Sequence, residues 1–480
     1  MNLNTTQVIV FFLISALIAF ATYWKCRGAR HVEDGNKDYF LAGGGLSWIF
    51  VAGSITLTNL STDQLVGMNG SQMALVAWWE FAAVIGLGIL CFVFIPVYYK
   101  YNCTTTTELL EKRYNNKDIR AIISVLFLMG NIFIFLPAVL YTGSLFMKNM
   151  FGVELSLYVI AAAFALVGAA YAVFGGLRAV AVSDTFSGVL LLTMALAVVY
   201  LALNAINFDL SGIPKERLTM IGDADSSIPW TTLLTGMIFI QTFYWSTNQT
   251  ITQRAMASPT VKEAQKGILA AAAIRLLIVP PIIVLPGIVA FKLYGDIGDA
   301  AYGRIVGDIL PAWMSGAFAA AIAAAVLTTF NSILNSSTAL YVCDIHETYL
   351  NKKPNVKRLS LFVTIAMVGV ALMMVPVYNK PDASIIDTLQ KLYGLLSMPI
   401  LSTFIVGLLF KNVDARAMMI AVVFGVALYA FFTFVWSPTH YIHLMFVTLL
   451  SCIGMALFLN SAIFGAKTEW DAPNVLSGPK

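Results

Sequence analysis

The sequence predicts an all-α, polytopic membrane protein of about thirteen transmembrane helices, ten of which form two inverted five-helix repeats. The first observation is composition: 59% of the 480 residues are hydrophobic and 11% are charged, whereas a soluble domain carries about 25% charged residues. The second is a series of apolar windows of about 20 residues, the length that spans a bilayer. The third is a polar motif in the second window that recurs in the seventh. The windows cover residues 7–25, 47–66, 74–99, 119–147, 155–174, 183–206, 230–252, 264–291, 310–343, 358–378, 384–409, 415–436 and 440–465.

The first window, 7–25, is predicted to be a retained transmembrane helix that precedes the first repeat. It differs from a signal peptide because no basic residue precedes it and no small-residue cleavage site follows it. Lys25, Arg27 and Arg30 follow it instead. Basic residues favour the cytoplasmic side, so the N-terminus is expected outside.

The first repeat is predicted over residues 47–206, and its first helix is polar near its middle. The stretch TNLSTDQLVGMNG (58–70) begins inside an apolar run and includes an acid, Asp63. Hydrogen bonds between neighbouring helices explain isolated Ser, Thr and Asn residues in membrane helices. They explain a dense cluster poorly, and they do not explain the acid.

The second repeat is predicted over residues 230–409, because its first helix carries a similar motif. The stretch IFIQTFYWSTNQTITQR (238–254) shares a Ser-Thr-[Asp/Asn]-Gln core with the first repeat. An offset of five windows makes the second half inverted relative to the first. Inverted repeats with interrupted first helices are typical of secondary transporters, where the opened backbone lines a binding cavity. Two additional helices over 415–465 complete a single domain of residues 1–480.

Few other charges and few paired hydroxyls lie within the apolar windows, so each is informative. Glu80, Arg275 and Lys391 are the charged residues to consider. Glu80 and Arg275 either share a cavity with a solute or neutralise each other as a structural pair. Thr328 and Thr329 are adjacent hydroxyls that suit a hard cation with oxygen ligands. Hydrogen bonds back to the preceding helical turn are the alternative.

The distribution of Lys and Arg predicts one orientation in the membrane. With the N-terminus outside, 21 of the 29 Lys and Arg residues fall in cytoplasmic segments and 6 in external ones. This bias follows the positive-inside rule. The C-terminus is therefore expected in the cytoplasm, and the loop over 207–229 outside.

Several stretches together resemble the solute:sodium symporter family, and within it the sodium/sugar cotransporter branch. The likeness covers most of the chain, and the stretches stand in the family's order. It implies a fold of the leucine-transporter type, with ten core helices in two inverted halves and flanking helices. The stretches are DYFLAGGGLSW (38–48), NLSTDQLVGMNG (59–70), YAVFGGLRAVAVSD (171–184), YWSTNQTITQR (244–254), EAQKG (263–267) and LTTFNSILNS (327–336).

The resemblance also implies a sodium site between the first and eighth core helices. Its ligands would be three backbone carbonyls and two side-chain hydroxyls. The family usually has serine at one or both hydroxyl positions, and threonine keeps the oxygen. Carried over position by position, the ligands are the carbonyls of Leu57, Leu60 and Ala325 and the hydroxyls of Thr328 and Thr329.

For the solute, the resemblance implies a polar pocket beneath an aromatic gate at Tyr244, with Trp245 beside it as a second aromatic face. Amides and carboxylates suit sugar hydroxyls, which both donate and accept hydrogen bonds. Gln241 stands where asparagine is common, and Arg275 stands where lysine is common. Phe135 and Ala83 stand where the galactose-binding relative is polar. The implied polar contacts are Asn59, Gln64, Glu80, Gln241, Arg275 and Gln390.

The predicted function is a sodium-coupled secondary active symporter that imports a small polyhydroxylated solute, foremost a sugar, by alternating access. It would lie in a cell membrane, a bacterial inner membrane in particular, with the lipid bilayer, sodium and the solute as its partners and no nucleic acid. A sugar acid, sulfated sugar, inositol or amino acid stays open as cargo, since Arg275 favours an anion and Glu80 disfavours one. The aromatic gate and the lack of a repeated selectivity filter disfavour an ion channel. The lack of a nucleophile–base arrangement or metal cluster disfavours an intramembrane enzyme.

Overall fold

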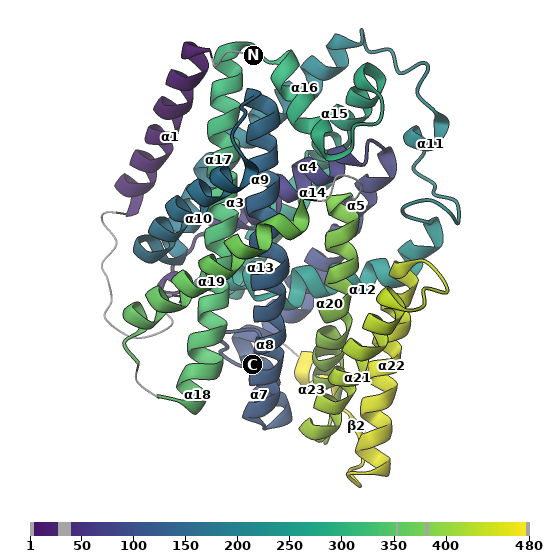
Figure 1. Cartoon of the computed structure of the whole chain (residues 1–480). Coiled ribbons are helices and arrows are strands. Elements are labelled where there is room, and N and C mark those ends of the chain that lie inside the picture. Colours follow the sequence, from purple (N-terminus) through teal and green to yellow (C-terminus); the bar gives the residue numbers. More distant parts are fainter. Residues whose placement is uncertain (1–3, 27–39, 352–353, 380–383, 477–480) are drawn as a thin grey trace.

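The computed structural model describes residues 4–26, 40–351, 354–379 and 384–476, and it is almost entirely helical (Figure 1). The side chains of residues 26, 170–176, 178, 179 and 476 are not described either. The basic residues expected after the first helix, Arg27 and Arg30, therefore lie outside the described residues. The predicted all-α membrane architecture is confirmed, with one two-stranded ladder added.

Ten helical stretches of the described chain are long and apolar enough to cross a membrane. Each coincides with one of the predicted windows, and several contain short π-helical or 3-10 segments, labelled η. They are α1 (Thr5–Cys26); η2, α5, η3 and α6 (Ala74–Ala77, Trp78–Ile89, Leu90–Phe94, Ile95–Lys100); α8, η4 and α9 (Lys117–Gly130, Asn131–Phe135, Leu136–Phe151); the second part of α10 (Leu157–Ala205); α14 and α15 (Val261–Leu277, Val279–Tyr294); α17, η8 and α18 (Ala312–Ala339, Leu340–His346, Glu347–Tyr349); α19 (Val356–Tyr378); α20 (Ile385–Leu409); α21 (Ala415–Phe434); and α22 (Tyr441–Ala462).

The first helices of both predicted repeats are interrupted at their polar motifs. In the first, α3 (Trp48–Asn59) ends before Leu60 and Ser61, which have non-helical dihedral angles, and α4 (Thr62–Gly70) follows. In the second, α12 (Gly236–Thr242) continues into the π-helix η6 (Phe243–Thr247). The extended residue Asn248 then caps α13 (Gln249–Met256) through its side chain. The breaks free backbone groups in the middle of the helical bundle, as the sequence predicts.

One predicted boundary is wrong. The windows 155–174 and 183–206 were expected to be separate spans, but α10 runs without a break from Leu157 to Ala205. The stretch between the windows contains no proline, so every backbone N–H can reach a helical acceptor. At 1.5 Å per residue, 49 residues extend about 74 Å, more than twice the roughly 30 Å hydrocarbon core. Thus α10 is too long for a single perpendicular crossing.

Helix α3 is closely packed against its neighbours inside the bundle. The most buried of the ten spanning stretches contains α17. The least buried is α1, which lies on the opposite side of the molecule from α21 and α22 (Figure 1). A Cβ atom added at Gly53 of α3 would collide with Thr185 of α10, and one added at Gly188 would collide with Leu57. Small residues at these points let α3 and α10 approach closely, which places the α3–α4 break inside the bundle.

The remaining elements are short and connect or cap the spans. A two-residue ladder pairs β1 (Phe410–Lys411) with β2 (Glu469–Trp470) after the last span. The others are η1 (Ala42–Gly44), α7 (Glu108–Tyr114), α11 (Lys215–Leu218), η5 (Trp230–Leu234), η7 (Gly298–Ala300), α16 (Ala301–Ile309) and α23 (Ala472–Leu476).

Candidate functional site

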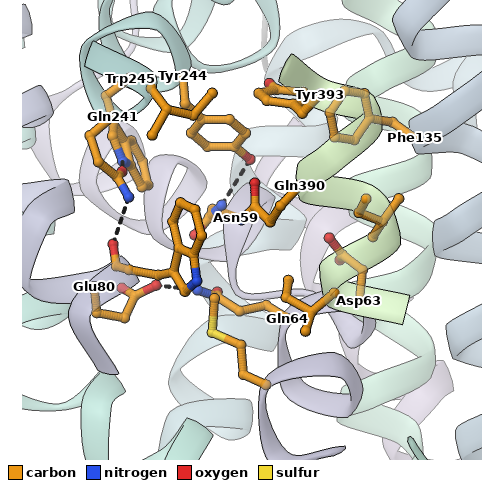
Figure 2. A pocket seen from close by; sticks show the side chains of 15 residues that line it. Asn59, Asp63, Gln64, Glu80, Phe135, Gln241, Tyr244, Trp245, Gln390 and Tyr393 are labelled. Carbon is orange, nitrogen blue, oxygen red and sulfur yellow. Dashed lines mark hydrogen bonds between the residues drawn. The ribbon is translucent and has the colours of Figure 1, made fainter. Parts of the chain in front are cut away.

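A cavity lies where the two interrupted helices meet α5, η4 and α20. Its lining combines amides, carboxylates and aromatic rings, as in small-molecule sites. Figure 2 shows Glu80, Gln241 and Trp245 on one side of the cavity and Asp63, Phe135 and Tyr393 on the other. The lining residues are Asn59, Asp63, Gln64, Met68, Trp79, Glu80, Phe135, Ile240, Gln241, Tyr244, Trp245, Ile386, Leu389, Gln390 and Tyr393.

Glu80 and Arg275 form a buried ion pair at one wall of this cavity. Arg275 Nη2 lies 2.6 Å from Glu80 Oε1, and the side chains are 0% and 2% exposed. The same nitrogen donates to Asn59 Oδ1 and to Gln64 Oε1, and Gln64 also donates to Glu80 Oε1. The arginine also lies 4.8 Å from the centre of the Trp245 ring. This network orients three cavity-lining side chains and neutralises the Glu80 charge.

Gln241 is held between two tryptophans of the same wall. Its amide donates to the carbonyl oxygen of Trp79 over 2.9 Å, and its oxygen accepts from the Trp245 indole N–H over 2.8 Å. The wall depends on the absence of a side chain at Gly86 of α5, since a Cβ atom there would meet the Gln241 backbone. Gly86 thus sets the spacing between α5 and α12.

Tyr244 lies against the cavity in a cluster of aromatic rings. Its hydroxyl accepts a 2.8 Å hydrogen bond from Asn59 Nδ2, which links η6 to the end of α3. The ring centre lies 5.8 Å from that of Tyr393, which in turn lies 4.6 Å from Phe135. Asn248, at the second helix break, donates to the Tyr393 hydroxyl. Both breaks therefore hold the aromatic cluster in place.

Seven of the eight predicted solute-binding residues line the cavity, namely Asn59, Gln64, Glu80, Gln241, Tyr244, Trp245 and Gln390. Arg275 does not line it, because its side chain is fully buried behind Glu80. Eight lining residues were not among the predicted contacts, and three of them are Asp63, Trp79 and Tyr393. The first two adjoin predicted residues in the sequence, and that adjacency was the available signal. Tyr393 follows Gln390 by three positions, almost one helical turn.

The five residues of the candidate sodium site lie at the end of α3 and on α17, and one hydrogen bond joins the two helices there. The Thr329 hydroxyl donates to the Leu57 carbonyl over 3.4 Å, and the Thr328 hydroxyl donates to the Ala325 carbonyl over 3.2 Å. Leu60 is the first non-helical residue after α3. These oxygens are the ligand type that a hard cation takes. The Thr328 bond is also the back-bond expected of a helical threonine.

A second buried charged group beside this site was absent from the sequence predictions. Asp184 Oδ2 accepts from the Ser54 hydroxyl over 2.6 Å, and Arg254 Nε donates to the same hydroxyl over 3.0 Å. Ser54 lies one helical turn before Leu57 of the candidate sodium site. The separation of Arg254 and Asp184 by 70 positions hid this group from the sequence, although each was visible as a charge in or near a predicted window.

The fold and the cavity together define a class of protein. Two interrupted helices that face a polar cavity inside a bundle of membrane helices are the architecture of a secondary transporter. Among the described residues, no group of three or more His, Cys, Asp and Glu side chains could hold a metal ion.

The chain belongs to the sodium:solute symporter family, whose model matches residues 39–425. An uncharacterized symporter YidK of Escherichia coli (strain K12) is 34% identical over 95% of this chain and 83% of its own length. A sodium/glucose cotransporter of Vibrio parahaemolyticus is 30% identical over 94% of this chain and 89% of its own. A sodium/myo-inositol cotransporter 2 of Sus scrofa is 26% identical over 89% of this chain and 69% of its own.

Solved structures support the fold. The chain is similar to a Na⁺-coupled sialic acid symporter in a substrate-bound, outward-open state, with a TM-score of 0.83, 17% identity, and 97% and 99% of the two chains covered. A nucleobase-cation-symport-1 family transporter, Mhp1, in a closed conformation gives a TM-score of 0.58 at 14% identity over 86% and 93%. The predicted leucine-transporter-type fold is therefore confirmed. The protein is a multi-pass membrane transporter and not an enzyme, and it couples solute movement to sodium.

Proposed function

We propose that the co-transported solute is a small, neutral, polyhydroxylated molecule such as a sugar. The observation that carries the proposal is the cavity at the two helix breaks, where amides and carboxylates stand beside aromatic rings. Amides offer both donors and acceptors, which matches the dual character of hydroxyl groups. Aromatic faces at Tyr244, Trp79 and Trp245 suit the apolar face of a ring. The relatives named sodium/glucose and sodium/myo-inositol cotransporter support the same class of solute.

The proposed contacts with the solute are the predicted set with one change of role. Gln64, Glu80 and Gln241 would hold hydroxyl groups along one wall, while Asn59 and Gln390 contribute from the other elements. Tyr244 and Trp245 would close over the ring. Arg275 acts through Glu80, since it does not line the cavity. It is a positioning residue in this proposal.

The proposed sodium ligands are the carbonyls of Leu57, Leu60 and Ala325 and the hydroxyls of Thr328 and Thr329. Leu57 and Leu60 lie at the end of α3, whose last residue, Asn59, contacts both Tyr244 and Arg275, and the other three ligands lie on α17. Sodium bound there would stabilise the same arrangement of α3 that the solute needs, and two ligands that favour one state couple thermodynamically. Inward movement of one charge across 100 mV contributes about 2.3 kcal/mol to accumulation.

The proposed arrangement in the membrane follows the charge distribution. The N-terminus lies outside and the C-terminus lies in the cytoplasm of a bacterial inner membrane, with inverted halves at 47–206 and 230–409 and accessory helices at 7–25 and 415–465 in a single domain of residues 1–480. The 21-to-6 excess of Lys and Arg in the segments assigned to the cytoplasm supports this orientation.

Radiolabelled uptake into proteoliposomes tests the proposed function. The purified full chain is reconstituted, and uptake of D-glucose and myo-inositol is measured with an inward gradient of sodium chloride or of choline chloride. We expect accumulation of at least one of the two solutes only with sodium, and exchange of labelled for unlabelled solute when the gradient is absent. Equal uptake in both salts, or no uptake of either solute, contradicts the proposal.

A further inference from the structure

Asp63 is a carboxylate in the wall of the cavity with one oxygen that has no partner among the described residues. It stands in the first turn of α4, directly after the break, and lines the cavity. Its Oδ1 atom is buried and has no hydrogen-bond partner among the described residues. No Lys or Arg of the described chain forms an ion pair with it, whereas Glu80, which lies on the opposite side of the cavity in Figure 2, is paired with Arg275.

The charges around the cavity do not balance. Asp63 and Glu80 are the charged residues in its lining. The Glu80 charge is cancelled by Arg275 at 2.6 Å. Lys391 lies on the same helix as Gln390 but places its ammonium group 5.9 Å from the centre of the Tyr441 ring, and it does not line the cavity. The lining therefore keeps one uncompensated negative charge when Asp63 is ionised.

The helix N-terminus does not fully offset the cost of an ionised carboxylate at Asp63. A carboxylate in the first turn gains from the helix dipole, but this gain is a fraction of the cost of an unpaired charge within a membrane. A donor group of a solute that enters the cavity would supply the remainder. A second unpartnered acceptor, Oε2 of Glu80, lies on the opposite wall. A solute that satisfies both oxygens must present hydrogen-bond donors at two ends.

We infer that Asp63 is a specificity-determining residue that accepts a hydrogen bond from a hydroxyl or ammonium group of the solute and excludes anionic solutes. This inference rests on the proposed function and narrows it. Sugar acids and sulfated sugars are rejected because their anionic group would face an unpaired carboxylate, and Arg275 is already engaged by Glu80. The selectivity is thus decided by Asp63, although Arg275 is the residue whose charge would suit an anion.

Uptake of two sugars that differ at one carbon tests the inference. D-glucose and D-glucuronate have the same ring, but the second carries a carboxylate in place of a hydroxymethyl group. The full chain is reconstituted in proteoliposomes, and uptake is measured with an inward sodium gradient. We expect the wild type to take up D-glucose at least tenfold more efficiently than D-glucuronate. Where myo-inositol is the better neutral substrate, it replaces D-glucose in the comparison.

Two substitutions separate the charge of Asp63 from its shape. Asp63→Asn should raise KM for the neutral solute at least tenfold and reduce discrimination against D-glucuronate at least tenfold, while Asp63→Glu should keep the discrimination. Asp223→Asn, in the exposed loop after α11, serves as the matched control and should behave as the wild type. A sodium-dependent increase in Tm of each purified variant shows that it is folded and binds sodium.

The outcomes distinguish the role of Asp63 from the proposed transport function. Efficient sodium-dependent uptake of D-glucuronate by the wild type, or wild-type KM and discrimination in Asp63→Asn, overturns the role of Asp63 and leaves sodium-coupled sugar transport standing. Uptake of the neutral solute without sodium dependence contradicts the proposed function itself.

Discussion

Glu80 has two roles that the sequence presented as alternatives. It lines the cavity and also forms a buried ion pair with Arg275. Oε1 is occupied by Arg275 and Gln64, while Oε2 has no partner in the described chain. One oxygen thus supports the structure and the other is free for a solute hydroxyl. A single substitution at Glu80 must affect both roles.

Glu80→Gln is expected to lower both stability and solute affinity. The substitution leaves Arg275 buried without a counter-charge, and loss of one member of a buried pair costs about 3–5 kcal/mol. The Tm of the purified protein should fall, and the Kd for the neutral solute should rise at least tenfold. A double variant, Glu80→Gln with Arg275→Met, removes the unpaired charge and should recover Tm without recovering affinity. Recovery of both by the double variant would show that Glu80 does not contact the solute.

Thr328→Ala and Thr329→Ala are expected to raise the sodium concentration for half-maximal uptake, each at least tenfold. Each removes one oxygen from a site with few ligands. Serine at either position keeps the oxygen and should preserve sodium dependence. Thr338→Ala on the same helix removes a buried hydroxyl that bonds to Leu334, and it should leave sodium dependence unchanged. Parental sodium dependence in both alanine variants would place the sodium site elsewhere.

At the scale of elements, the two broken helices control the cavity through their packing partners. The α3–α4 break supplies Asn59, Asp63 and Gln64, and the α12–η6–α13 segment supplies Gln241 and Tyr244. The contact between α5 and α12 depends on a glycine, so the cavity is sensitive to substitutions that touch no solute.

Gly86→Ala is expected to lower solute affinity at least tenfold by separating α5 from α12. The new methyl group would collide with the Gln241 backbone and approach Trp245 Cδ1 to 2.8 Å. Overpacking of this kind costs about 1–3 kcal/mol. Gly88→Ala is the matched control two positions along the same helix, where a Cβ meets nothing within 4 Å. Solute Kd values for the two variants provide the measurement, and equal values would contradict the role of this contact.

At the scale of the whole molecule, Asp299 joins elements that lie far apart in the sequence. Its Oδ2 accepts from the backbone N–H of Ile385 at the start of α20 over 3.0 Å, and its backbone packs against Gly70 at the end of α4. Burial raises the pKa of Asp299 to about 7; the hydrogen bond from Ile385 lowers this pKa, and the nearby Asp387 carboxylate raises it.

Stability is expected to fall with rising pH because of Asp299. A carboxyl group whose pKa is higher in the folded than in the unfolded state favours folding below the unfolded value, and this contribution is lost as pH rises through the folded value. The window therefore runs from about pH 4 to about pH 7. Tm measured across this window should decline less in Asp299→Asn than in the wild type. An identical decline in both proteins would assign the pH dependence to other groups.

Topology is tested by labelling single cysteines in intact cells. In a cysteine-free background, Ser211→Cys, in the exposed loop after α10, should react with an impermeant thiol reagent added outside. Ser477→Cys, which lies outside the described residues, should react only after permeabilisation. The expectation follows from the positive-inside bias. The reverse pattern would invert the proposed orientation.

The sequence by itself determined the membrane class, the two helix breaks and the family. It also identified seven of the residues that line the cavity. Apolar windows and dense polar motifs are local in the chain, and the membrane penalises each one in place. Only the tertiary structure decided that Arg275 lies behind the cavity and pairs with Glu80, and that Asp63 Oδ1 has no partner in the described part of the chain. It also replaced the expected break near residue 180 by the continuous helix α10. Charge pairing acts through space between helices that the sequence separates by almost 200 positions, so no local pattern records which charge is cancelled and which stays free for the solute.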